Sequence, residues 1–312
     1  MSRVPAAIAR RLALPLIAAP MLRVSGPDLV VAACNAGVIG AFPTKNARTA
    51  DQLDAWLTDI RARLGPDAAP FCPNLIMRDE RLAEDLAVVA RHGAELVITS
   101  VGSPAPAVAA LHDAGALVLA DVATLRHAER AIAAGADGLI LLTAGAGGQT
   151  GWLNPFAFVR AVRSMFDGVV VLAGGVSDGQ ALAAAITLGC DLAYMGARFI
   201  ATRESLASDA YRAMLVDASM DDVLLTSAIT GLPTNMLAPS IHAAGLDPKR
   251  LDEEIGEARA RARFGAGAAG PRRWTDIWSA GHSVSGVRDI CSVQALVDQT
   301  MAEFECQPLE AS

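Results

Sequence analysis

The chain has 312 residues, of which 53% are apolar and only 4% aromatic, and its formal net charge is −7. An acidic chain without a basic cluster is unsuited to binding nucleic acid, and five scattered cysteines without a CxxC pair predict neither a metal site nor a disulfide framework. The apolar stretch 29–43 is too short and too interrupted for a membrane-spanning helix, which needs ~20 apolar residues. Because no secretory signal opens the chain either, we expect a cytoplasmic protein.

Short β-rich runs alternate with alanine-rich helical segments along the first two thirds of the chain. We predict eight strands, at residues 14–21, 38–44, 70–77, 95–102, 116–123, 138–144, 168–175 and 192–199. Seven helices are predicted between them, at residues 26–36, 47–64, 81–92, 104–114, 125–134, 155–166 and 177–188. Strict alternation of this kind predicts a parallel sheet covered by helices, which is an α/β fold.

Two α/β architectures are compatible with that alternation, a doubly wound sheet and a closed barrel. A doubly wound sheet usually carries GxGxxG after its first strand, but here the first strand is followed by "APMLRVSG". Eight units in a row, with the weak repeat "HGAELVI", "DAGALVLA" and "AAGADGLI", favour the barrel. We therefore predict a (β/α)8 TIM barrel over residues 1–202.

The pattern changes after the eighth strand. Residues 203–265 carry charged helical patterns and are predicted to form a helical insertion. An insertion at this point overhangs the carboxyl ends of the strands, where barrel active sites lie, so we expect it to act as a lid. Its apolar, proline-bearing part at 229–241 is expected to wall the substrate pocket. Residues 266–312 are predicted to return to the barrel and to end in a closing helix.

Glycine residues end the seventh strand, in "AGGVSDG", and the eighth, in "MGARF". In barrels these two loops form the usual phosphate site. Gly174 and Gly175 would let backbone N–H groups approach a phosphate closely, and the helix beginning near Ser177 would point its positive end at it. Such a phosphate would belong to FMN or to a phosphorylated substrate. The alternative is that these glycines serve only tight turns.

Two further segments could contact a planar ligand. The sixth strand runs into the glycine-rich "AGAGGQTG" at 144–151, which we interpret as a loop lying flat against such a ligand, with a solvated loop as the alternative. Asn74, at the end of the third strand, offers amide donors and an acceptor that match the pyrimidine edge of a flavin. Pro20, at the end of the first strand, is by itself a common structural feature.

In their order along the chain, "APM", "NLI", "AGAGGQTG", "AGGVSDG" and "MGARFIAT" resemble the nitronate monooxygenase (2-nitropropane dioxygenase) family of FMN-dependent barrel oxidoreductases. This resemblance implies an FMN cofactor and a set of residues around its ring system: Ala19, Pro20, Met21, Asn74, Gly147 and Gly148. It assigns the phosphate to Gly174, Gly175, Gly196 and Ala197. Asp121 falls where family members place a polar residue near the flavin.

The best-known members of that family carry a histidine, acting as catalytic base, in the glycine loop, where this chain has Gln149. Glutamine donates and accepts hydrogen bonds but takes no proton near neutral pH. We assign Gln149 and Asp121 as candidate catalytic residues. Of the five histidines, His242 in the insertion and His282 in the return loop are expected to reach the mouth, and we assign both to the substrate site.

The resemblance implies oxidation of alkyl nitronates by O2 to a carbonyl compound and nitrite. The alternative is an FMN-dependent NAD(P)H reductase or dehydrogenase that acts on an enone, a quinone or an acyl thioester. A third reading is a barrel that binds a phosphorylated ligand without catalysis. We expect a small-molecule substrate, O2 or NAD(P)H as co-substrate, no nucleic-acid or membrane partner, no metal, and the homodimer that is common among such barrels.

Overall fold

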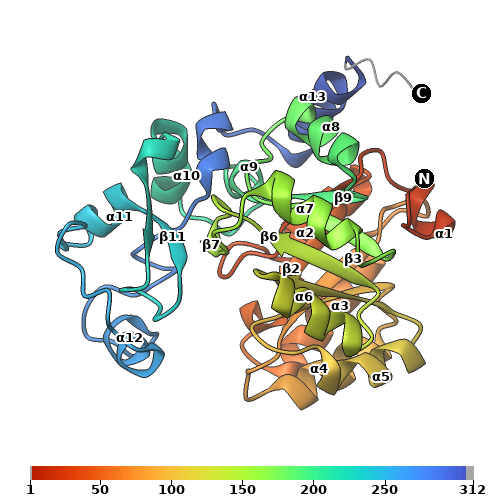
Figure 1. Cartoon of the computed structure of the whole chain (residues 1–312), viewed down its shortest axis with the longest axis horizontal. Helices are drawn as coiled ribbons and strands as arrows, with labels where there is room; N and C mark the ends of the chain where they lie inside the picture. Colours follow the sequence, from red (N-terminus) through yellow and green to blue (C-terminus); the bar gives the residue numbers. More distant parts are fainter. Residues whose placement is uncertain (1, 307–312) are drawn as a thin grey trace.

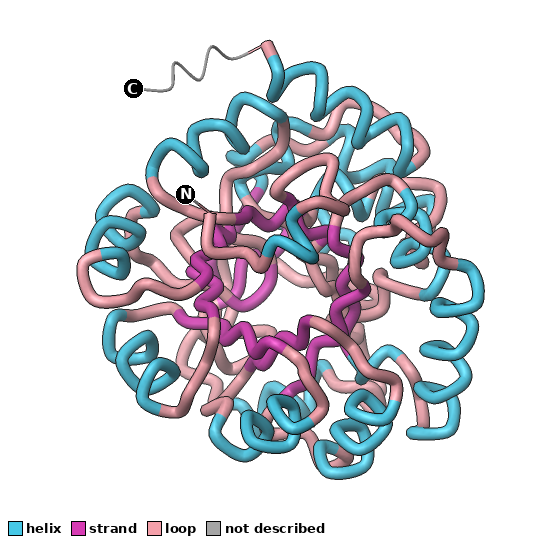
Figure 2. Tube along the Cα trace, turned by 90° about the vertical axis from the view of Figure 1, so that its right-hand side faces the viewer, coloured by secondary structure: helices cyan, strands magenta, loops and turns pink. Residues whose placement is uncertain are grey.

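The computed structural model describes residues 2–306, and its centre is a closed barrel of eight parallel strands (Figure 1, Figure 2). The strands are β1 (Leu16–Ala18), β2 (Ile39–Pro43), β3 (Phe71–Ile76), β4 (Leu96–Ser100), β5 (Leu117–Val122), β6 (Gly138–Leu142), β8 (Val169–Ala173) and β9 (Leu192–Met195). The barrel closes where Ile17 of β1 pairs with Tyr194 of β9. The predicted (β/α)8 fold and its eight strands are confirmed.

The predicted helices are also confirmed, and they form the outer ring seen in Figure 2. They are α2 (Pro27–Asn35), α3 (Ala50–Arg63), α4 (Leu82–Arg91), α5 (Ala105–Asp113), α6 (Leu125–Ala133), α7 (Pro155–Arg163) and α8 (Gly179–Leu188). Side-chain oxygens of Thr49, Thr124, Asn154 and Asp178 accept hydrogen bonds from the first turns of α3, α6, α7 and α8. These caps are local signals that place the helix starts where the sequence predicts them.

The amino-terminal end of the barrel is plugged. A short helix, α1 (Ala6–Ala9), lies across this end, and Val4 and Ile8 belong to the same buried cluster as the aliphatic side chains inside the barrel (Figure 2). Those side chains include Ile17, Ile98 and Ile140, which come from three different strands. The carboxyl end of the barrel is therefore the one that can receive a ligand.

The insertion is not wholly helical, and that prediction is wrong for residues 223–237. Helix α9 (Ala197–Ile200) directly precedes the segment. The segment itself contains α10 (Asp209–Asp217), η2 (Met220–Asp222), β10 (Val223–Thr226), β11 (Thr234–Leu237), α11 (Ala238–Ala243) and α12 (Glu257–Phe264). Strands β10 and β11 form a three-stranded antiparallel sheet with β7 (Gly148–Gln149), a two-residue strand in the glycine loop. Gly231 and Pro233 interrupt any helix here, and backbone pairing with the loop favours strands.

The end of the chain returns to the barrel. The return passes through η3 (His282–Gly286) to α13 (Val293–Glu305), which packs on α8. A side chain on Gly179 would collide with the backbone of α13, and Glu303 Oε2 accepts a hydrogen bond from Gly179 N at 3.0 Å. Residues 307–312 of the predicted return segment lie outside the described residues. None of the helices in residues 2–306 has the length and apolar character that a membrane crossing requires.

Candidate active site

The turn after β1 and the turn after β9 lie side by side at the barrel mouth. Ala19 N donates a hydrogen bond to Met195 O at 3.0 Å. A Cβ atom on Gly196 would lie 3.8 Å from Met21 Sδ and 3.9 Å from Ala19 Cβ. The structure therefore brings the "AAPM" segment, including Pro20, next to Gly196 and Ala197, two groups of residues that the sequence assigned to one cofactor.

The turn after β8 has the geometry of an anion site. A Cβ atom on Gly174 would lie 2.6 Å from Thr143 Oγ1, whereas a Cβ atom on Gly175 would have no neighbour within 4 Å, so Gly175 faces open space with a φ of +80°. Helix α8 starts just beyond it, with its positive end towards this turn. Within the described residues the N–H groups of Gly175, Gly196 and Ala197 have no acceptor. Free N–H groups of this kind at a helix start fit a phosphate.

The glycine loop is held in place by the insertion and the return segment. Asn235 Nδ2 donates to Ala146 O at 2.7 Å, while Ser279 Oγ accepts from Gly148 N at 2.7 Å and donates to Asn235 O at 2.6 Å. Thr234 pairs with Gln149 in the small sheet. We call Thr234, Asn235 and Ser279 the glycine-loop clasp. Because its members are buried, the clasp fixes a loop that its composition alone would leave flexible.

The glycines of this loop have different surroundings. A Cβ atom on Gly147 would lie 2.9 Å from Gly281 N, so Gly147 permits backbone-to-backbone packing against the return segment. Gly148 faces open space instead. His282 N donates to Gly145 O at 2.8 Å and brings an exposed imidazole to the loop. His242 lies exposed in α11 and makes no hydrogen bond to the loop within residues 2–306.

Polar residues end three neighbouring strands of the barrel. Ser100 Oγ on β4 donates to Asn74 Oδ1 on β3 at 3.2 Å, and both side chains are buried. Because this bond occupies the Asn74 oxygen, the Asn74 amide remains to donate to a ligand, as a flavin carbonyl would require. Asp121 follows on β5, and burial raises the pKa of its carboxyl to about 7. A buried carboxyl that titrates near neutrality is a common feature of active sites.

Gln149 lies at the edge of the glycine loop, next to the insertion. Its backbone pairs with Thr234, and its side chain is half-buried at the edge of the glycine loop. We did not predict Asn235, Ser279 or Tyr194 as site residues from the sequence. Of these three, only Tyr194 could have been found from the local sequence, because side chains alternate along β9 and this alternation points Tyr194 into the barrel. Asn235 and Ser279 have none, since their partners are far away in sequence.

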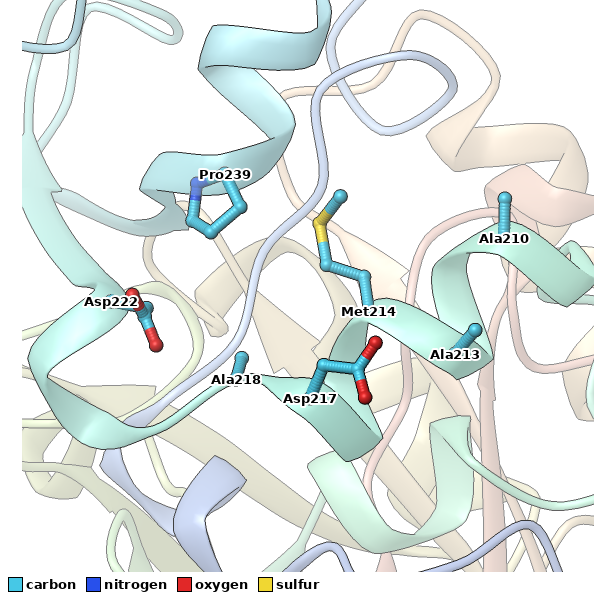
Figure 3. A pocket seen from close by; sticks show the side chains of 7 residues that line it. All are labelled: Ala210, Ala213, Met214, Asp217, Ala218, Asp222 and Pro239. Atoms are coloured by element: carbon cyan, nitrogen blue, oxygen red, sulfur yellow. The ribbon is translucent and has the colours of Figure 1, made fainter.

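A separate surface groove of about 400 Å³ lies between α10, η2 and α11 (Figure 3). It is lined by Ala210, Ala213, Met214, Asp217, Ala218, Asp222 and Pro239. Asp222 is engaged by Ser219 in a capping box, and no histidine, cysteine or glycine turn lines the groove. We assign it no part in catalysis. Among the residues described, no group of three or more His, Cys, Asp and Glu side chains could hold a metal ion.

Comparison with known proteins identifies the family. A family model described as nitronate monooxygenase matches residues 79–303, which is well over half of the chain. The chain belongs to the nitronate monooxygenase family. A nitronate monooxygenase from Paraburkholderia phytofirmans is 28% identical over a match that covers 81% of this chain and 85% of that protein. The nitronate monooxygenase family is generally flavin-dependent, and this member is an oxidoreductase.

Other proteins similar to this chain are named for different reactions. A (3aS,4S,5R,7aS)-5-hydroxy-7a-methyl-1-oxo-octahydro-1H-indene-4-carboxyl-CoA dehydrogenase from Mycobacterium tuberculosis is 30% identical over 72% of this chain, and the match spans only 62% of that protein. Nitroalkane oxidase from Streptomyces ansochromogenes superposes with a TM-score of 0.79 at 27% identity, covering 96% of this chain and 98% of that one. FabK from Thermotoga maritima superposes with a TM-score of 0.78 at 23% identity, covering 98% of this chain and 96% of that one. At this identity the similarity supports the fold alone.

The clasp provides a first testable prediction. Ser279→Ala leaves the half-buried Gly148 N–H and the buried Asn235 carbonyl unpaired, so we expect the free energy of unfolding to fall by about 1–3 kcal/mol. We also expect flavin affinity to fall roughly tenfold, which corresponds to about 1.4 kcal/mol, because the glycine loop loses its anchor. Urea unfolding and a fluorescence titration with FMN measure the two effects.

Ser240→Ala is the matched control for this change. Ser240 Oγ is also buried in the same region, but it donates to Leu237 O at 2.7 Å and accepts from Trp278 N at 2.9 Å, away from the glycine loop. We expect a similar loss of stability with unchanged flavin affinity. Equal flavin affinity in the two variants would show that the hydrogen bonds of Ser279 to the glycine loop do not contribute to flavin binding.

Proposed function

We propose that the protein binds FMN at the barrel mouth and oxidises alkyl nitronates with O2 to a carbonyl compound and nitrite. The free N–H groups of Gly175, Gly196 and Ala197 would hold the phosphate, and Asn74 would donate to the ring edge. Ala19, Pro20, Met21, Gly147 and Gly148 would complete the lining. FMN would supply the redox chemistry, and the chain would bind and orient both partners.

The observation that carries the choice of nitronate is Gln149. The pairing of its backbone with Thr234 places the side chain at the edge of the glycine loop, where an amide can donate a hydrogen bond. A nitronate is already an anion, so it needs a donor to its oxygens and no base to remove a proton. The Paraburkholderia relative, named nitronate monooxygenase, supports this choice.

A dehydrogenase acting on an acyl thioester is the second candidate, and two observations favour it. The relative from Mycobacterium tuberculosis is named as a dehydrogenase of a CoA ester. Asp121 supplies a carboxyl with a pKa near 7 at the mouth, which suits removal of a proton from a neutral substrate. On this reading the exposed His282 beside Gly145 would contact the substrate, and the insertion would close over it as a lid.

Anaerobic mixing decides between these candidates. The flavin-loaded protein is mixed separately with ethylnitronate, with NADH or NADPH, and with an acyl-CoA, and the flavin absorbance is followed. We expect rapid bleaching with ethylnitronate only, then recovery of colour and release of nitrite when O2 is admitted. Bleaching by NAD(P)H or by the acyl-CoA, without a response to ethylnitronate, would establish a reductase or a dehydrogenase instead. A cytoplasmic homodimer stays part of the proposal, and size-exclusion chromatography tests the dimer.

A further inference from the structure

Three titratable side chains face the otherwise aliphatic inside of the barrel. Tyr194 of β9 and Cys72 of β3 belong to the buried cluster that fills the barrel. Asp121 lies two residues after Leu119, another member of that cluster, and side chains two apart on a strand share a face. Asp121 therefore also points into the barrel, at the end of β5 that opens to the mouth.

Two polar atoms of this group are buried without a partner. Within residues 2–306, neither Asp121 Oδ1 nor the Tyr194 hydroxyl has a hydrogen-bond partner. Buried polar groups in folded proteins are almost always paired, since leaving one unpaired is costly. The two atoms are complementary, because a tyrosine hydroxyl donates and a carboxylate only accepts. Three strand-to-strand steps separate β5 from β9, through β6 and β8, so the two side chains enter the barrel interior from different sides. Asp121 is near enough to Tyr194 for its charge to raise the pKa of the tyrosine hydroxyl.

We infer that Asp121 and Tyr194 form a proton-binding pair in the floor of the barrel mouth, in which the Tyr194 hydroxyl donates through one bound water to Asp121 Oδ1. A water is the natural bridge, because it can accept from the hydroxyl and donate to the carboxylate. Asp121 then holds the exchangeable proton. Tyr194 is a positioning residue that favours the ionised form of that carboxyl.

The electrostatics of the neighbourhood agree with this pairing. Among residues 2–306, the titratable groups that act on or are acted on by Asp121 are Tyr194 and Cys72. On the adjoining strands, Ile140 of β6 pairs with Asp121, and Ser100 of β4 follows the Thr99–Ala120 pair; neither side chain titrates. Burial raises the pKa of Tyr194 well above its usual value, and the nearby Asp121 and Cys72 raise it further. The tyrosine therefore keeps its proton and remains a donor across the working pH range.

The pair gives the mouth an acid–base group that Gln149 cannot supply. Oxidation of a nitronate needs no removal of a proton, so a catalytic use of the pair rests on the second proposed function, the acyl-thioester dehydrogenase. The existence of the pair rests on neither function. The proton equilibrium of Asp121 can be measured in the full chain with or without flavin. A failure of the flavin proposal and a failure of the pair are therefore distinguishable results.

The first test measures the pKa of Asp121 directly. A 13C NMR titration follows the aspartate carboxyl signals, and the signal that is lost in Asp121→Asn identifies Asp121. Burial alone raises the pKa of Asp121 to about 7, and a donor to the carboxylate lowers it. We therefore expect the midpoint of the wild type to lie about one unit below that of Tyr194→Phe, in which the ionised carboxyl has lost its donor. An unchanged midpoint in Tyr194→Phe would overturn the pair.

Tyr211→Phe is the matched control, since Tyr211 is the other tyrosine of the chain and is also buried. Its hydroxyl donates to Ser279 O rather than into the barrel. Tyr211→Phe therefore loses a buried hydroxyl as well, and we expect it to leave the Asp121 midpoint unchanged. If both variants shift the midpoint equally, the effect is a general loosening and the pair is refuted.

The second test uses stability, which needs no bound flavin. The folded-state pKa of about 7 lies above the unfolded value of about 3.9. Folded Asp121 therefore holds its proton more tightly, and the stability of the wild type falls as pH rises from about 4 to about 7. The variant Asp121→Asn lacks this titrating group. The difference between its melting temperature and that of the wild type should therefore increase in favour of the variant as pH rises over the same range. Parallel melting curves for the two proteins would contradict the inference.

Discussion

The protein is expected to turn over ethylnitronate with a kcat/KM at least about 100-fold higher than that for neutral nitroethane, because general base catalysis is worth roughly 10²–10⁴-fold where it is used. Neutral nitroethane must lose a proton before it can be oxidised, and Gln149 in the glycine loop cannot take one. Ethylnitronate has already lost that proton. Steady-state nitrite release, with each form of the substrate added separately, measures the ratio.

Gln149→His provides the complementary variant. Placing an imidazole at the edge of the loop should raise the rate with neutral nitroethane and leave the rate with ethylnitronate within a fewfold of the wild type. The clasp should still hold the loop, since Thr234 pairs with the backbone of residue 149 and not with its side chain. Equal rates with the two substrate forms in the wild type would show that another group, with Asp121 first in line, removes the proton.

Gly175→Val is expected to weaken FMN binding by at least about 100-fold, which corresponds to roughly 2.7 kcal/mol. Gly175 has a φ of +80° and faces open space at the start of α8. A valine side chain would fill the space that the phosphate needs, and its φ requirement would move the N–H groups of the turn. Fluorescence titration of the apoprotein with FMN gives the dissociation constant.

Gly115→Val controls for the strain that any side chain introduces. Gly115 has a φ of +81° and no neighbour within 4 Å of a Cβ atom, but it follows α5 at the amino-terminal end of the barrel. Both variants should lose comparable stability, because a non-glycine residue in this conformation costs about 1–2 kcal/mol. FMN affinity should be unchanged in Gly115→Val. The same dissociation constant for both variants would remove Gly175 from the phosphate site.

The barrel could be predicted because each of its units is specified locally. Caps such as Thr124 and Asp178 begin helices, and glycines such as Gly115 and Gly189 follow their ends. These signals act over one turn of the chain and need no distant partner. The strand ends that carry Gly174, Gly175, Gly196 and Asn74 could be placed at one mouth for the same reason, since parallel strands end on one side. Their roles in cofactor binding stay predictions.

The strands of the insertion could not be predicted from the local sequence. Residues 223–226 and 234–237 are strands because β11 pairs both with β10 and with the backbone of Gly148 and Gln149, and no helical periodicity reveals a partner of this kind. The hydrogen bond from Gly148 N to Ser279 Oγ joins residues 131 apart in sequence. The sequence therefore predicts a flexible glycine loop, whereas in the structure hydrogen bonds fix this loop to β11 and to Ser279.

The sequence by itself determined the barrel, the positions of its glycine turns and the replacement of the family histidine by Gln149, because these depend on residue identity and short-range order. Only the tertiary structure decided which side chains meet. Strand alternation points Asp121 and Tyr194 inward. Closure of the barrel makes them share one buried space, and burial there raises the pKa of the carboxyl. Burial and long-range contact arise from the whole fold. The sequence could therefore mark Asp121 as a candidate catalytic residue, but it could predict neither the raised pKa of that carboxyl nor the nearby Tyr194.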